Sequence, residues 1–278
     1  MVKAKKILFV TQEMVPYVPG SPMADFGRKV SETTQSRSRE IRTFMPKWGI
    51  INERRNQLHE VIRLSGMNLI IDDTDHPLII KVASITSAHM QVYFIDNDDY
   101  FSKRRMTYDE QEMEYADNAE RAVFYARGVL ETVKKLRWVP EVIHCQGWMS
   151  SIIPLYIKTS YAEEPSFRDC RVVYTPSDVP LQTMLPENFP GVLHFRNADI
   201  SCMEGLPNTT SMNALDLLGV KYADGVSMLK SDAELEKFAL SLEKPYLSPQ
   251  EPENYATAYP TFYDTVWSVG KEEKEEEE

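Results

Sequence analysis

The sequence predicts an α/β fold: a Rossmann-like, mostly parallel sheet with an antiparallel hairpin extension at one edge. Short apolar runs of strand-forming residues alternate with helical stretches along most of the chain, which is typical of parallel sheets covered by helices on both faces. Between residues 60 and 95 no helix-length pattern separates the runs, which indicates hairpins. With 278 residues, the chain is long enough to bury a sizeable core.

The first expected element is a buried strand at Ile7–Val10, followed by a loop rich in proline and glycine. Helical character extends from Met23 to about Arg39, and Glu40–Met45 then alternates in polarity until Pro46 ends the run. This order of strand, helix and strand opens a parallel unit. We therefore expect Ile7–Val10 in the middle of the sheet.

Four short strand-like runs follow, separated by turn residues such as Gly66, Asp72 and Pro77. They are Val61–Leu64, Met67–Ile71, Leu78–Ile85 and Met90–Ile95. Because consecutive runs this close together pair as hairpins, we expect them at one edge of the sheet.

The clearest predicted helix is the segment Asp109–Arg137. Seven residues there step alternately by four and three positions, so they share one helical face: Tyr115, Ala119, Ala122, Ala126, Val129, Val133 and Leu136. The strands expected after this helix are Val142–Cys145, Arg171–Tyr174 and Tyr222–Met228, and the apolar run Ile152–Ile157 lies between the first two.

The domain organisation follows from a change of composition near residue 245. Residues 1–245 are expected to form one domain. Residues 246–270 are rich in proline and tyrosine and are expected to form an extended arm that packs on the body through Tyr255, Tyr259, Phe262 and Trp267. Residues 271–278 include six glutamates and are expected to be a disordered acidic tail.

Composition excludes several classes of partner and site. The net charge of −11 argues against nucleic acid, whose phosphates the chain would repel. Three cysteines without a CxxC spacing, and five scattered histidines, argue against a zinc site and against a disulfide framework. We expect no metal and no cofactor, and cysteines in a reducing compartment.

The beginning of the chain resembles a signal peptide only briefly. Met1–Lys6 is basic, but the apolar run Ile7–Val10 ends after four residues, where a secretory signal needs about 7–15. No run approaches the ~18 apolar residues of a membrane span. The expectation is a cytoplasmic protein that does not bind a membrane.

Several motifs together resemble the start of the bacterial glycogen and starch synthases. They are Lys6–Val10 with Glu13, Pro16 and Ala24-Asp25; Met45–Gly49; Tyr93–Asp96 with Tyr100-Phe101; Asp117–Arg121; and Pro140–His144 with Trp148 and Pro154. Their order and spacing over residues 5–160 make the resemblance specific, and it fades after about residue 230.

The resemblance implies the fold and the chemistry of that family. These synthases are two-domain transferases of the GT-B fold that move glucose, usually from ADP-glucose, to the end of an α-glucan. Their N-terminal domain mainly binds the acceptor, and their C-terminal domain carries most of the nucleotide-sugar site. This chain resembles the N-terminal, acceptor-side domain only. Asp117 and Arg121, spaced i and i+4, are expected to pair and to hold the long helix under the sheet.

Three loops depart from the pattern of the family. In the loop His144–Trp148, Gln146 replaces a histidine and Gly147 an aspartate. Its Lys-Thr-Gly-Gly loop is Pro19-Gly-Ser-Pro22 here, so a cation and a flexible cradle of backbone N–H groups for phosphate are lost. The histidine expected near the transferred sugar is Ser177, which lacks the charge and basicity of imidazole. We assign no catalytic residue. The candidate residues for glucan binding in the cleft are Asp25, His144, Gln146, Trp148, Ser177 and Asp178.

Trp148 has two interpretations: it stacks on a sugar ring, or it packs in the core, which a lone aromatic residue favours. Two hypotheses of function remain. The chain is a binding module or scaffold for an α-glucan or a protein partner that is not catalytic alone, or it is half of a split ADP-glucose-dependent glucosyltransferase completed by another chain. The first is favoured because the three loops are altered. The sequence leaves the oligomeric state open.

Overall fold

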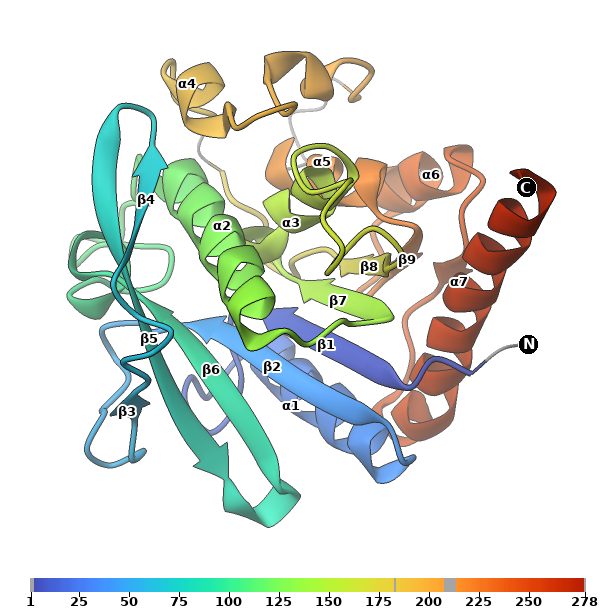
Figure 1. Ribbon diagram of the computed structural model, residues 1–278, viewed down its shortest axis with the longest axis horizontal. Coiled ribbons are helices and arrows are strands. Elements are labelled where there is room, and N and C mark those ends of the chain that lie inside the picture. Colours follow the sequence, from blue (N-terminus) through green and yellow to red (C-terminus); the bar gives the residue numbers. More distant parts are fainter. Residues whose placement is uncertain (1–2, 183, 208–213, 278) are drawn as a thin grey trace.

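The computed structural model describes residues 3–182, 184–207 and 214–277, and within them ten strands form one twisted sheet with helices on both faces (Figure 1). The strands are β1 Lys6–Thr11, β2 Glu40–Pro46, β3 His59–Glu60, β4 Met67–Ile71, β5 Thr74–Ile85, β6 Met90–Asp96, β7 Val142–Gln146, β8 Arg171–Thr175, β9 Gly225–Ser227 and β10 Tyr246–Leu247. The helices are α1 Pro22–Ser36, α2 Asn118–Leu136, α3 Ile152–Lys158, α4 Phe189–Leu193, α5 Ala214–Tyr222, α6 Ala233–Ser241 and α7 Tyr255–Glu277.

The strand order is β10-β9-β8-β7-β1-β2-β6-β5-β3, with β4 paired to β5. Every neighbouring pair from β10 to β6 is parallel, and β5 pairs antiparallel with β6, β3 and β4. The predicted parallel sheet, with β1 in its middle and hairpins at one edge, is confirmed. The run Val61–Leu64 was wrongly predicted as a strand. In this run only the backbone N–H of Val61 donates a hydrogen bond to the sheet, to the carbonyl of Ile80, and the chain then turns away.

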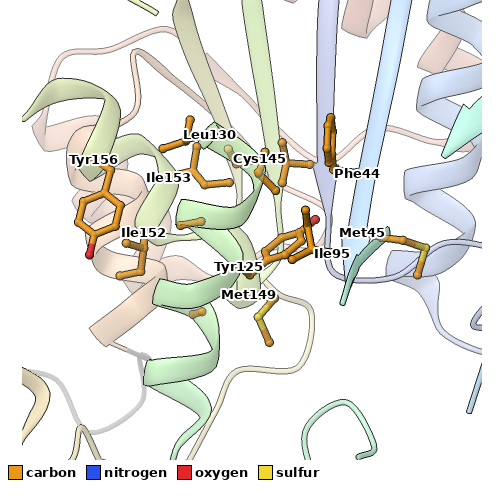
Figure 2. Packing of buried hydrophobic residues seen from close by; sticks show 14 of the residues in the cluster. Phe44, Met45, Ile95, Tyr125, Leu130, Cys145, Met149, Ile152, Ile153 and Tyr156 are labelled. Carbon is orange, nitrogen blue, oxygen red and sulfur yellow. The ribbon is translucent and has the colours of Figure 1, made fainter. Parts of the chain in front are cut away.

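The central strand separates two cores. Leu8 and Val10 point into a large core under α2 and α3, whereas Ile7 and Phe9 point into a smaller core under α1 and α7. This alternation follows from the two-residue period of a strand. Figure 2 shows the large core, where side chains from α2, α3, β2, β6 and β7 meet.

Helix α2 buries the predicted face, because Ala119, Ala122, Ala126 and Val129 are all buried. The helix begins at Asn118, so the prediction was wrong to include residues 109–117 in it.

The expected pair between Asp117 and Arg121 does not form. Asp117 pairs with Arg104, and the buried Arg121 guanidinium donates to three backbone carbonyls between Tyr100 and Met106 and to Asn118. Arg121 therefore fastens the preceding loop to the helix, which is a structural role, as predicted.

Residues 246–270 do not form an extended arm. They contain strand β10, a 3₁₀ turn at Pro252–Asn254 and the start of α7. Their packing on the body was predicted correctly, since Tyr255, Tyr259, Phe262 and Trp267 are all buried. The spacing of these aromatic residues fits one helical face, and Pro260 removes only one backbone donor near the start of the helix. The acidic run predicted to be disordered continues α7 as far as Glu277.

A buried ion pair fastens α7 to the body. Asp264 accepts from Arg39 Nη1 at 2.9 Å, from Arg39 Nη2 at 2.8 Å and from the backbone N–H of Ala4 at 2.7 Å. Arg39 also donates to the carbonyls of Ala4 and Pro260. The pair joins the loop before β2, the start of the chain and the last helix. Among the described residues, no helix is both long and apolar enough to cross a membrane.

Candidate functional site

Two adjoining pockets lie where β1, β7 and β8 end. Since these strands are parallel, the loops that follow them meet at the same edge of the sheet. The large pocket has a volume of about 580 Å³ and is lined by Gln12, Glu13, Ser21, Arg105, Met106, Thr107, Tyr108, Asp109, Glu112, Trp148, Asp178 and Val179. The small pocket, of about 180 Å³, is lined by Pro176, Ser177, Asp178, Pro180, Asp216, Met228, Leu229, Lys230, Ser231, Asp232 and Leu235. Asp178 lines both.

The loop after β1 satisfies its own polar groups. Ser21 caps α1, because its Oγ accepts from Ala24 N at 3.0 Å, and the same hydroxyl donates to Glu13 Oε2 at 2.6 Å. Gln12 Nε2 donates to Glu13 Oε1 at 2.9 Å. Pro22, the first residue of α1, has no N–H. The helix start, where a phosphate would bind, is thus occupied by a side-chain cap with a carboxyl group beside it.

Burial is the main influence on Glu13 and raises the pKa of its carboxyl group, against the opposing hydrogen bonds from Ser21 and Gln12. The charge of Asp178 raises it further. Asp25, a predicted candidate, lies exposed in the first turn of α1 and lines neither pocket.

The loop after β7 depends on a glycine. Gly147 has a φ of +81°, and a Cβ on it would lie 2.1 Å from Gln12 Oε1. The backbone can therefore pass close to Gln12 only because residue 147 is glycine. Gln12 Oε1 has no hydrogen-bond partner within the described part of the chain, although the residue is only 3% exposed. It leaves one buried acceptor at the wall of the large pocket.

Trp148 lines the large pocket, but its side chain is packed in the large core and is 1% exposed. Its backbone N–H donates to Ser177 Oγ at 2.6 Å. The geometry favours the core-packing interpretation of this tryptophan.

His144 and Gln146 do not reach the pockets, contrary to their prediction as cleft residues. Both are completely buried on the α1 and α7 side of β7. The two nitrogens of His144 lie 2.8 Å from the Tyr263 hydroxyl and 2.7 Å from Thr175 Oγ1, and Gln146 Nε2 lies 3.2 Å from Nδ1. Burial lowers the pKa of His144 to about 3, so the ring is neutral. His144 and Gln146 belong to β7, and side chains within a strand point to the two faces of the sheet. The pockets are formed mainly by the loops that follow the strands.

The loop after β8 brings Ser177 and Asp178 to the pockets, and their role in binding a glucan stays a prediction. Ser177 is held by Asp216, which accepts from its backbone N–H at 3.2 Å and from the Tyr174 hydroxyl at 2.5 Å. Burial raises the pKa of Asp216 to about 6. Sequence reasoning missed Asp216, although a lone aspartate in the apolar run Leu215–Leu218 was a signal for a buried polar role.

Acidic side chains outnumber basic ones in the large pocket. Glu13, Asp109, Glu112 and Asp178 face it, against Arg105. Within the described residues, no group of three or more histidine, cysteine, aspartate or glutamate side chains is arranged to hold a metal ion. The arrangement suits a neutral ligand with hydrogen-bond donors better than a phosphate.

The parallel sheet and the loops at its carboxyl edge define one lobe of a GT-B glycosyltransferase fold. A family model described as the starch synthase catalytic domain matches residues 6–231. The chain belongs to this family, as the motifs predicted, and the match ends where the resemblance was expected to fade.

Two bacterial glycogen synthases support this assignment. The chain is 35% identical over 225 residues to the glycogen synthase of Chlorobaculum tepidum, which covers 80% of this chain and 45% of the relative. It is 32% identical over 236 residues to that of Chlorobium phaeobacteroides, covering 80% and 47%. The chain thus spans about half the length of these relatives.

Among solved structures, the catalytic domain of starch synthase IV from Arabidopsis thaliana, bound to ADP and acarbose, is similar with a TM-score of 0.72. The match covers 90% of this chain and 52% of that one, at 14% sequence identity. At this identity the likeness shows the fold.

Proposed function

We propose that this chain is an α-glucan-binding module of the glycogen and starch synthase family and that it does not transfer glucose by itself. The observation that carries the proposal is the closed start of α1. Ser21 caps the helix, Pro22 offers no N–H, and the Glu13 carboxyl group lies against the cap. A nucleotide phosphate there would find the Ala24 N–H already bonded to the cap and no N–H on Pro22, and it would meet an acidic side chain.

The large pocket supports glucan binding for a different reason. The carboxylate of Asp178 can accept hydrogen bonds from sugar hydroxyls, and the buried, unpartnered Oε1 of Gln12 can do so once its side chain turns toward the pocket. Tyr108, which is 38% exposed, offers an aromatic surface beside them. Hydroxyl groups gain little over water on binding, so we expect weak, millimolar-range affinity on the order of 1 mM.

The altered loop after β8 argues against catalysis. The Ser177 hydroxyl already accepts from Trp148 N, and its backbone is held by Asp216. A serine fixed in this way supplies neither the charge nor the basicity of a histidine to a leaving phosphate.

Two assays test the proposal. We expect no transfer of radiolabel from ADP-glucose to glycogen, and saturable binding of maltoheptaose by calorimetry. Gln12→Leu, which removes the acceptor and also the Nε2 bond to Glu13 at similar volume, should weaken that binding about 2- to 10-fold. Gln91→Leu, an exposed glutamine of β6 outside both pockets, is the matched control and should bind like the parent.

Other outcomes separate the alternatives. Turnover by the lone chain would contradict the proposal. Turnover that appears only when a second protein from the native host is added would support a split ADP-glucose-dependent transferase instead. Neither turnover nor glucan binding would leave a module that binds a protein partner.

A further inference from the structure

A basic pocket of about 360 Å³ lies where strands β8 and β9 begin, at the opposite end of these strands from the large and small pockets. Arg171 is the first residue of β8, Asp224 directly precedes β9, and Lys244 lies two residues before β10. Lys158 and Lys221 enter from the last turns of α3 and α5. The pocket is therefore formed where parallel strands begin and their connecting helices end.

The charge of the basic pocket contrasts with that of the chain. Lys158, Arg171, Lys221 and Lys244 line it, against the carboxyl groups of Asp224 and Glu243. The chain as a whole carries −11. All four cationic residues are half-buried, so they are held against the body of the protein rather than extended into solvent.

The contacts of the three lysines leave capacity for a ligand. Lys158 Nζ lies 2.7 and 2.8 Å from the two oxygens of Asp224. Lys221 Nζ donates to the carbonyls of Cys202 and Glu204, at 2.8 and 2.6 Å. Lys244 Nζ donates to the carbonyls of Val220 and Lys221. An ammonium has three protons, so each can donate once more.

Capping of helix carbonyls by lysine is common and explains part of this arrangement. Carbonyl oxygens are uncharged, however, so the positive charges of Lys221 and Lys244 are not neutralised by these contacts. The pKa of Lys244 is lowered to about 8, mainly by burial; the charge of Asp224 opposes this shift, and the charges of Lys158 and Lys221 add to it. Capping also does not account for four cations around a cavity of ligand size.

We propose that the basic pocket binds a small molecule that carries a phosphate group. A phosphate is a compact divalent anion with several acceptor oxygens, which matches converging ammonium and guanidinium donors. The site would be separate from the proposed glucan site, because the two lie at opposite ends of the same strands. This proposal does not depend on glucan binding.

The test is calorimetric titration of the full chain with inorganic phosphate, pyrophosphate and glucose 1-phosphate at constant ionic strength. We expect saturable binding of at least one probe with one site per chain. Lys244→Met and Arg171→Gln should each weaken it at least about tenfold. Lys29→Met, an exposed lysine of α1, makes the same charge change as the lysine variant and should stay within about twofold of the parent.

The comparison of probes distinguishes free phosphate from a phosphorylated sugar, since tighter binding of glucose 1-phosphate would include the sugar in the site. Absence of saturable binding for all three probes would overturn the proposal. So would an equal loss of affinity in Lys29→Met, because the binding would then reflect net charge alone.

A second variant covers the case in which neutral substitutions disturb folding. Lys244→Arg keeps the charge, and its guanidinium stays protonated at pH 9. The probe here is glucose 1-phosphate, because a phosphate monoester has a second pKa of about 6 and is already a dianion over this range. Its affinity should fall severalfold in the parent between pH 7 and pH 9, as Lys244 loses its proton, and should stay nearly constant in Lys244→Arg. Identical profiles would show that the phosphate does not lie beside Lys244.

Discussion

Removing the charge of Asp264 should weaken the attachment of α7 to the rest of the fold and lower the stability of the chain. Asp264 is the anionic partner of Arg39, whose side chain is 2% exposed, and it also accepts from Ala4 N. In Asp264→Asn an amide NH₂ replaces one of the carboxylate oxygens that face the guanidinium. The variant therefore leaves a buried cation without its counter-charge while changing the side-chain volume very little.

The expected loss can be worked out from the contacts. Two charge-assisted hydrogen bonds to Arg39 are lost or weakened, each contributing about 1.5–3 kcal/mol. Breaking a buried pair by removing one partner costs about 3–5 kcal/mol. Because Asp264 is 18% exposed and water can reach part of the site, we place the loss near the lower limit, at about 3 kcal/mol.

Urea denaturation at pH 7, followed by circular dichroism, measures this loss in the free energy of unfolding. Asp98→Asn is the matched control, since it removes the same charge from an exposed pair with Lys103 and should change stability by less than about 1 kcal/mol. If Asp264→Asn and Asp98→Asn unfold at the same urea concentration, α7 is not fastened as the structure shows.

Two further changes test the core and the loop that carries Ser177. Ala126→Asp should destabilise the chain by about 3 kcal/mol or more, as for an unpaired buried charge, and a variant that melts like the parent would contradict the packing of α2. Asp216 has a folded pKa raised to about 6 by burial, so its contribution is present below about pH 4 and is lost as pH rises from about 4 to 6. Asp216→Asn keeps an acceptor and lacks this titration. In urea melts its stability relative to the parent should therefore rise across that window by about 2–3 kcal/mol, and a difference that is constant with pH would refute the raised pKa.

Most of the sheet could be predicted from the sequence because its elements carry local patterns. The apolar runs of β1, β7 and β8, and the stepped face of α2, are set by burial on strands and helices. Helix α7 was missed because the prolines in and before it were given more weight than its aromatic spacing. A single proline near a helix start removes one donor, whereas burial of Tyr259 and Tyr263 against the sheet stabilises the helix over several turns.

The site was less predictable because it depends on contacts that the sequence does not display. Glu13 was visible as part of a matching motif, but its bond to Ser21 became evident only in three dimensions. Asp216 reaches Ser177 across 39 positions of sequence. The loop residues Arg105–Glu112 gave no motif at all, yet they form one wall of the large pocket.

The residues that match the family best lie mostly away from the pockets, and this bears on how far the resemblance extends to function. His144 keeps its identity, but it is buried, neutral and bonded to Tyr263 of α7, so it supports the fold. Arg121 binds backbone carbonyls in the same supporting manner. The loop at Ser21, by contrast, departs from the family pattern and lies at the large pocket, where Ser21 caps the start of α1. Our proposal is that the scaffold persists while these loops no longer bind a nucleotide sugar, so the function of this chain has to be tested at the loops that follow β1 and β8.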